Sequence, residues 1–169
     1  MRVVSWNVNG LRAALRKGFT DIIDELKPDV VLLQEIRVMP EQLTEAQANP
    51  QGWHVQWHPA EKKGYAGTAI WSREPLTDVT HGIGEHDVQG RVLSATTNGV
   101  RVVSVYPPSG SSGPEKQANK EVWLKQFAPW AGELRLAGRP AVMGGVGTSR
   151  AGPAAVWGRG GVEAGLHGR

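Results

Sequence analysis

Three polar residues stand where strand-like apolar segments end, and their side chains could carry phosphate chemistry. Asn7 follows "VVSW", Glu35 follows "VLLQ" and Tyr106 follows "VVSV". A carboxylate suits a hard cation such as Mg2+, an amide can orient an oxygen atom, and a phenol can stabilise developing charge. If neighbouring strand ends meet at one edge of a sheet, these groups come together. Spacing alone leaves another interpretation open, in which Asn7 ends a strand, Glu35 is solvated and Tyr106 is core.

The elements that must position these residues alternate between strand and helix at first and then become mostly strands. Buried strands are predicted at 2–6, 30–35 and 139–143, with a helical stretch at 11–26 that Gly18 interrupts and a short helix from Pro40. Further strands are predicted at short spacing, at 53–59, 67–72, 91–97 and 100–106. A helix over 115–136 should kink or divide at Pro129. This spacing favours antiparallel pairing and an α/β sandwich over a doubly wound parallel sheet.

Composition excludes several classes of protein. The 169 residues suggest one domain, and the absence of cysteine rules out disulfides and thiolate metal sites in this sequence. No apolar stretch approaches the ~18 residues of a membrane span, and the N-terminus does not resemble a signal peptide. We therefore expect a cytoplasmic protein without a membrane partner. The formal net charge of +3 does not by itself indicate a nucleic-acid partner.

The last 26 residues differ in composition from the rest of the chain. They hold nine of the 22 glycines and show no apolar periodicity. We expect residues 1–143 to fold and residues 144–169 to form a disordered, glycine-rich tail.

Four segments together resemble the exonuclease III / AP endonuclease family of the DNase I-like endonuclease/exonuclease/phosphatase superfamily. They are "VSWNVNGLRAAL", "PDVVLLQEIR", "EKKGYAGTAIWS" and "GRVLSATTNGVRVVSVYPPSGS". The resemblance covers roughly residues 1–145 and implies the N-terminal portion of a four-layer α/β sandwich with an incomplete second sheet. It also implies Mg2+-dependent hydrolysis of double-stranded DNA at abasic sites and from 3′ ends, in base-excision repair.

The resemblance assigns roles to individual residues. Asn7 matches an active-site asparagine near the metal, Glu35 the metal-binding glutamate, and Tyr106 the tyrosine that contacts the scissile phosphate. Arg91, Lys62 and Lys63 match positions near the DNA-facing edge, although the two lysines fit a solvated hairpin tip equally well. The family gives the histidines no metal role. We interpret His54 and His58 as surface or interlayer residues, and His81 and His86 as ordinary loop residues.

The sequence departs from the family where a catalytic Gly-Asp-x-Asn motif is expected. The aligned positions are Gly145 and Gly147, which can neither take a proton nor donate from a side chain. The second acidic metal ligand and the terminal Ser-Asp-His motif of the family are also missing from this sequence. We therefore predict a C-terminally truncated, inactive chain that binds Mg2+ or Mn2+ weakly at most. The alternatives are a catalytically dead DNA-binding module or a degenerate fragment, and the sequence does not indicate an oligomeric state.

Overall fold

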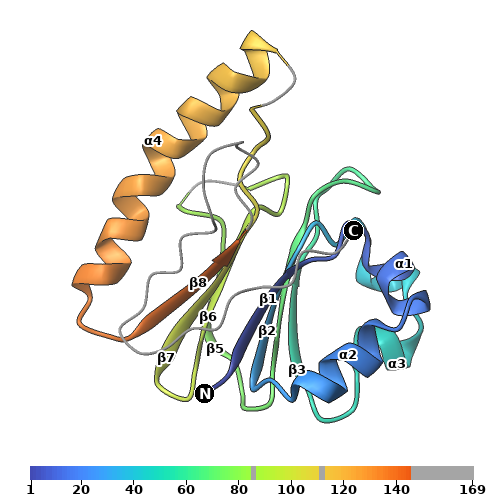
Figure 1. Ribbon diagram of the computed structural model, residues 1–169. Helices are drawn as coiled ribbons and strands as arrows, with labels where there is room; N and C mark the ends of the chain where they lie inside the picture. Colours follow the sequence, from blue (N-terminus) through green and yellow to red (C-terminus); the bar gives the residue numbers. More distant parts are fainter. Residues whose placement is uncertain (85–86, 111–112, 146–169) are drawn as a thin grey trace.

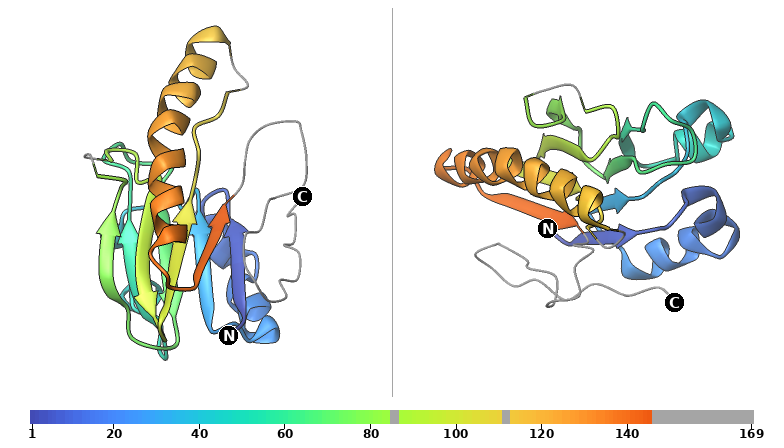
Figure 2. Two further views of the ribbon diagram at one scale, coloured as in Figure 1. Left: turned by 90° about the vertical axis from the view of Figure 1, so that its left-hand side faces the viewer. Right: turned by 90° about the horizontal axis from the view of Figure 1, so that it is seen from above.

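The computed structural model describes residues 1–84, 87–110 and 113–145. Two four-stranded sheets pack face to face, and helices cover their outer faces (Figure 1). Figure 2 shows the same layers from above, with α4 on one side and α1 and α2 on the other. The predicted four-layer α/β sandwich is confirmed. In the described part of the chain, no helix is long and apolar enough to cross a membrane.

The first sheet has the strand order β1-β2-β4-β3, and the second has the order β5-β6-β7-β8. The pairs β1-β2 and β7-β8 are parallel, while all other neighbours are antiparallel, as the short strand spacing predicted. Parallel neighbours need a long crossover, and helices supply it in both cases. The strands are β1 (Val3–Asn7), β2 (Val30–Gln34), β3 (His54–His58), β4 (Thr68–Ser72), β5 (Thr77–His81), β6 (Val92–Thr97), β7 (Val100–Val105) and β8 (Ala141–Gly145).

The helices are short on the first sheet and long on the second. Gly18 separates α1 from α2 with a φ of 90°, a conformation that favours glycine, so the predicted interruption is confirmed. Pro129 lies inside α4 without dividing it, because aromatic residues on both sides of it pack on the sheet. The elements are α1 (Leu11–Arg16), α2 (Phe19–Leu26), the 3-10 turn η1 (Pro40–Gln42), α3 (Glu45–Ala48) and α4 (Pro114–Leu136).

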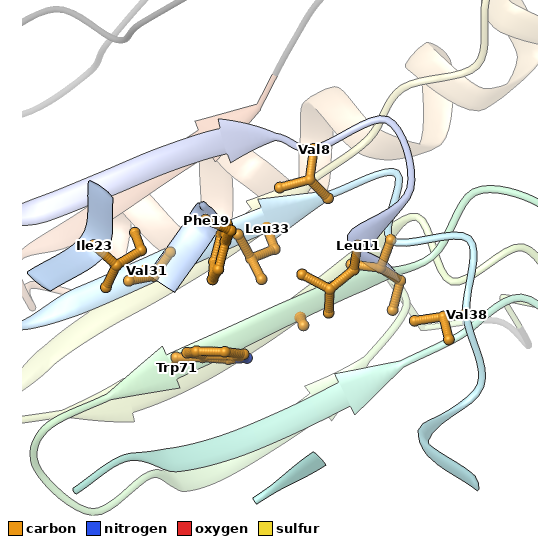
Figure 3. Close-up of a cluster of buried hydrophobic side chains, with 10 residues drawn as sticks. Val8, Leu11, Phe19, Ile23, Val31, Leu33, Val38 and Trp71 are labelled. Carbon is orange, nitrogen blue, oxygen red and sulfur yellow. The ribbon is translucent and has the colours of Figure 1, made fainter. Parts of the chain in front are cut away.

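Apolar side chains fill each space between layers. One cluster joins the first sheet to α1 and α2, and there Phe19 meets the edge of Trp71 (Figure 3). Phe19 also stacks on Trp6. A second cluster lies between the sheets, around Leu32, Ile70 and Leu93. A third joins β6 and β7 to the aromatic face of α4. Tryptophan side chains therefore take part in the packing on both outer faces of the sheets.

Two differences from the sequence expectations have simple physical causes. Strand β5 was not predicted, because only Val79 of its five residues is partly buried and the segment shows no apolar alternation. Its pairing with β6 makes it a strand. Strand β8 continues through Gly144 and Gly145, two residues beyond the expected end of the fold at 143, because both residues pair with β7. The rest of the predicted tail, 146–169, lies outside the described residues.

Candidate active site

Glu35, Tyr106 and Arg91 meet at the ends of strands from both sheets. Glu35 follows β2, Tyr106 follows β7 and Arg91 precedes β6. The two sheets are joined directly beneath them, where the Ser104 hydroxyl donates to the Leu33 carbonyl over 2.7 Å. Neighbouring strand ends therefore bring the predicted carboxylate and phenol together, close enough for the charge of Glu35 to contribute to a raised pKa of the Tyr106 phenol.

The Glu35 carboxylate is nearly buried and forms an ion pair with Arg37. Glu35 and Arg37 have positive φ angles, of 56° and 51°, which residues other than glycine seldom adopt. Backbone strain of this kind persists only where surrounding hydrogen bonds hold the residue in place. Here the Glu35 carbonyl accepts from the Gly10 amide over 2.8 Å, and the Arg37 amide donates to the Ala66 carbonyl over 2.9 Å. The backbone thus holds the carboxylate in a fixed place.

Arg91 holds Tyr106 from the other side. Its guanidinium donates to the Tyr106 carbonyl over 2.9 Å and lies 5.2 Å from the centre of the phenol ring. Burial, together with the nearby negative charge of Glu35, raises the pKa of the Tyr106 phenol above its ordinary value. The phenol therefore keeps its proton at neutral pH and can donate a hydrogen bond. Burial lowers the pKa of Arg91, while Tyr106 and Asp87 oppose that shift.

Asn7 takes part in the turn that follows β1. Its side-chain oxygen accepts from the Asn9 amide over 3.0 Å, and Asn9 has a φ of 47°. Asn7 pairs in register with Gln34, the residue before Glu35. The asparagine therefore stands beside the carboxylate in the sheet while its oxygen shapes the loop to α1. Both interpretations considered for the sequence, strand end and site residue, are compatible with this position.

Three arginines line a surface pocket beside the cluster, and the sequence analysis did not single them out. Arg12 and Arg16 lie one helical turn apart on α1, so they share a face, and Arg37 reaches the pocket from the loop after β2. The i, i+4 spacing inside "GLRAALR" was the signal that could have found two of them. The pocket is lined by Asn9, Gly10, Arg12, Ala13, Arg16, Ile36, Arg37 and Gly64.

The predicted DNA-facing lysines lie in the hairpin between β3 and β4. Lys62 and Lys63 are exposed, and the Lys62 ammonium lies 4.2 Å from the centre of the Tyr65 ring. Gly64, next in sequence, lines the arginine pocket, so the hairpin tip and the pocket adjoin. The third predicted DNA-facing residue, Arg91, belongs instead to the Glu35–Tyr106 cluster.

The position aligned with the catalytic aspartate has no room for a side chain. A Cβ atom at Gly145 would lie under 3.0 Å from the Val105 carbonyl oxygen of β7, a distance that real Cβ atoms do not show. At Gly144 a Cβ atom would lie 2.5 Å from the Ser5 hydroxyl. An acid at 145 would therefore need β8 to move. Gly147, aligned with the asparagine, lies outside the described residues.

The side chains at this site do not make a strong magnesium site by themselves. Glu35 is the carboxylate of the cluster, and Arg37 already neutralises it. Among the described residues, no group of three or more His, Cys, Asp or Glu side chains could hold a metal ion. Mg2+ is usually bound by one or two carboxylates together with substrate phosphates. We therefore assign no chemical step to a metal.

Comparison with known proteins gives this geometry its context. Residues 4–145 match the family described as "Endonuclease/Exonuclease/phosphatase family". An exodeoxyribonuclease of Bacillus subtilis is 38% identical over 137 residues, which are 79% of this chain and 53% of that protein. A DNA-(apurinic or apyrimidinic site) endonuclease of Dictyostelium discoideum is 34% identical over 114 residues, covering 66% of this chain and 31% of the relative.

Solved structures of related proteins have a similar fold. A 3′ phosphatase from Neisseria, bound to a product DNA hairpin, superposes with a TM-score of 0.77 at 32% identity, covering 86% of this chain and 56% of that chain. An AP endonuclease from Archaeoglobus fulgidus gives a TM-score of 0.74 at 29% identity, covering 86% and 56%. The chain thus spans about half the length of these two structures. It belongs to the endonuclease/exonuclease/phosphatase family, and it resembles the exonuclease III / AP endonuclease nucleases within that family.

Proposed function

We propose that this chain carries the DNA-binding edge and part of the active site of a DNA-repair phosphodiesterase of the exonuclease III / AP endonuclease type. The observation that carries the proposal is the Glu35–Tyr106–Arg91 cluster, which adjoins a pocket lined by three arginines. The substrate we propose is double-stranded DNA with an abasic site or an accessible 3′ end, and the place of action is the cytoplasm. The names of the nuclease relatives support this choice of substrate.

Each part of the site has a task in this proposal. Arg12 and Arg16 neutralise backbone phosphates, as arginine does in most DNA complexes, while Arg37 stays paired with Glu35. The Tyr106 phenol, which keeps its proton, donates to an oxygen of the scissile phosphate. Arg91 fixes the phenol and adds positive charge where the transition state gains negative charge.

Magnesium would bind mainly together with the substrate. Its chemistry in such a reaction is to polarise the phosphoryl oxygens. Glu35 would hold the ion, with Asn7 nearby and with substrate phosphates as further ligands. Because Arg37 competes for the carboxylate, we expect weak binding in the absence of DNA.

We also propose that this chain is inactive, or nearly so. Gly145 and Gly147 supply neither a proton acceptor nor a side-chain donor. General acid–base catalysis contributes about 10²–10⁴-fold in rate, and one oxyanion-type donor contributes about 10²–10³-fold. Where catalytic groups act as a unit, the removal of one group can remove most of the rate. A second candidate function follows from the same glycines and the arginine pocket, namely a catalytically dead module that holds DNA.

One experiment separates these functions. The purified chain is incubated with Mg2+ and a duplex that contains one abasic site, beside a Glu35→Gln variant. Cleavage at rates typical of the family, lost in Glu35→Gln, would overturn the inactivity and establish the nuclease. Binding that weakens with salt, without cleavage, would favour the binding module. If the chain neither cleaves nor binds the duplex, the proposed DNA-related function is refuted.

A further inference from the structure

A partly buried carboxylate organises the segment that leads into β6. The side chain of Asp87 is 14% exposed, and one of its oxygens accepts from the backbone amides of Arg91 over 2.7 Å and Val92 over 3.0 Å. The other oxygen accepts from the Gln89 amide over 3.2 Å. Asp87 therefore binds three amides of the short segment 87–92 and fixes its path.

His58, at the end of β3, binds the same carboxylate from the opposite side. Its Nε2 atom lies 3.2 Å from the Asp87 oxygen that binds the Arg91 amide. Because a carboxylate only accepts hydrogen bonds, Nε2 is the donor. The His81 ring, 4.9 Å away between centroids, packs against the His58 ring and limits its rotation. The sequence led us to expect His58 as a surface or interlayer residue and His81 as an ordinary loop residue, but His81 is the last residue of β5.

The segment 87–91 is also docked on the hairpin that carries the predicted DNA-facing lysines. The carbonyls of Val88, Gln89 and Gly90 accept from the Glu61 amide over 2.9 Å, the Gly67 amide over 3.1 Å and the Thr68 hydroxyl over 3.0 Å. A Cβ atom at Gly90 would collide with the His58 carbonyl, so glycine permits this close approach. The two loops therefore behave as one body.

Arg91 is the active-site residue that these contacts hold in place. Its amide is held by Asp87, its Nε donates to the Gln89 side chain over 2.7 Å, and its guanidinium binds the Tyr106 carbonyl. The Tyr106 amide in turn donates to the Arg91 carbonyl over 2.8 Å. The chain of contacts thus runs from His58 through Asp87 to the residue that holds the phenol.

We propose that Asp87 and His58 are positioning residues, which hold Arg91 on Tyr106 and align the lysine hairpin with the phosphate-binding edge. The proposal rests on the proposed DNA-binding function. Neither side chain touches substrate in it, and both act through Arg91 and the hairpin. It follows that their removal weakens DNA binding only while Arg91 is present.

The test is a double-mutant cycle read by DNA affinity. Fluorescence anisotropy measures binding of a labelled abasic-site duplex in EDTA to the wild-type chain and to Arg91→Ala, Asp87→Ala and the double variant. We expect Arg91→Ala to weaken binding about tenfold, the effect of losing one charged hydrogen bond. Asp87→Ala should weaken it several-fold alone and hardly at all in the Arg91→Ala background. Independent, multiplying effects would overturn the proposal.

Matched variants test the histidine. Gln can donate from a similar position, so His58→Gln should keep most of the affinity, whereas His58→Phe should behave like Asp87→Ala. His54→Phe, on the same strand with its side chain exposed, is the control and should leave affinity unchanged. Equal affinities for His58→Phe and wild type would overturn the role of His58. Thermal unfolding of each variant gives the folded fraction used to correct the affinities, and Asp87→Asn, which keeps an acceptor, replaces Asp87→Ala if that variant does not fold.

A second readout does not depend on DNA. The NMR signal of the Arg91 Nε–H and the exchange rates of the Arg91 and Val92 amides report the position of Arg91 directly. Asp87→Ala should shift the Nε–H signal and speed the exchange of the two amides. An unchanged signal and unchanged exchange rates would overturn the positioning role. If the wild-type chain binds no DNA, the proposed function fails, while these signals still decide whether Asp87 positions Arg91.

Discussion

Replacing Gln34 by leucine would remove the hydrogen-bonding centre between the two sheets. The Gln34 side chain is fully buried one residue before Glu35. Its amide nitrogen lies 3.0 Å from the Ser104 hydroxyl, 3.0 Å from the Leu32 carbonyl and 3.2 Å from the Ser5 hydroxyl. One side chain thus joins β1 and β2 of the first sheet to β7 of the second.

The size of the effect follows from these contacts. An NH2 group has two hydrogens, and the side-chain oxygen also accepts from the Ser5 hydroxyl over 3.4 Å, so up to three hydrogen bonds are lost, each worth about 0.5–1.5 kcal/mol net. Ser104 still donates to the Leu33 carbonyl, so the replacement does not orphan its hydroxyl proton. Leucine recovers part of the loss through burial. We expect the free energy of unfolding to fall by about 1–3 kcal/mol, and Tm by roughly 2–4 °C per kcal/mol at this chain length.

Urea unfolding followed by tryptophan fluorescence measures this change, with Gln56→Leu as the control. Gln56 lies on β3 and is partly exposed, so the same substitution there should change stability by less than about 0.5 kcal/mol. A Gln34→Leu variant as stable as Gln56→Leu would show that the network contributes nothing beyond packing, and would refute the reasoning.

Four further predictions follow. Lowering the pH should destabilise the fold in two steps. Burial and the nearby His58 lower the pKa of His81, so its contribution is present above the ordinary value of 6.5 and is lost below it. Burial opposes ionisation of Asp87, but hydrogen bonds from His58 and two backbone amides outweigh burial and lower the pKa of Asp87. The stability that Asp87 contributes is therefore lost as the pH falls below about 3.8. Urea unfolding at a series of pH values would show both losses of stability. Gly144→Ala should lower stability by about 1–3 kcal/mol in the same assay, because its Cβ would press on Ser5 and Leu32. Calorimetric titration with Mg2+ or Mn2+ should show weak binding that Glu35→Gln abolishes, and tight stoichiometric binding would contradict this. Gly145→Asp with Gly147→Asn should not restore cleavage of abasic-site DNA, and it should reduce stability.

The strand spacing predicted an α/β sandwich and the strand ends, because both depend on local apolar patterns, whereas the four layers were implied by the family resemblance. Strands β2 and β7 are mostly apolar, and their ends place Glu35 and Tyr106 where the fold brings them together. Strand β5 was missed because pairing with β6, rather than burial, makes it a strand. A pairing of this kind leaves little mark on the sequence.

The contacts within the site were less predictable, because they join residues far apart in the chain. The His58–Asp87 pair spans 29 positions, and the Gln34–Ser104 bond spans 70. Nothing in "HPAEKK" or "EHDVQG" shows that the two segments dock on each other. Residue type predicted which groups could do chemistry, but tertiary packing decided which of them met.

Gly145 stands where the resemblance places a catalytic aspartate, and the neighbouring backbone leaves no room for a side chain there. Gly145 pairs with Val105 in parallel register, and its Cα hydrogen side faces the Val105 carbonyl so closely that no side chain fits. Gly144 is closed in the same way by Ser5 and Leu32, side chains of the opposite sheet. The close approach of β8 to β7 at Gly145, and to the opposite sheet at Gly144, therefore excludes an acid at these two positions. An acid at 145 would require the end of β8 to move, which is why we expect Gly145→Asp with Gly147→Asn to leave the proposed inactivity unchanged.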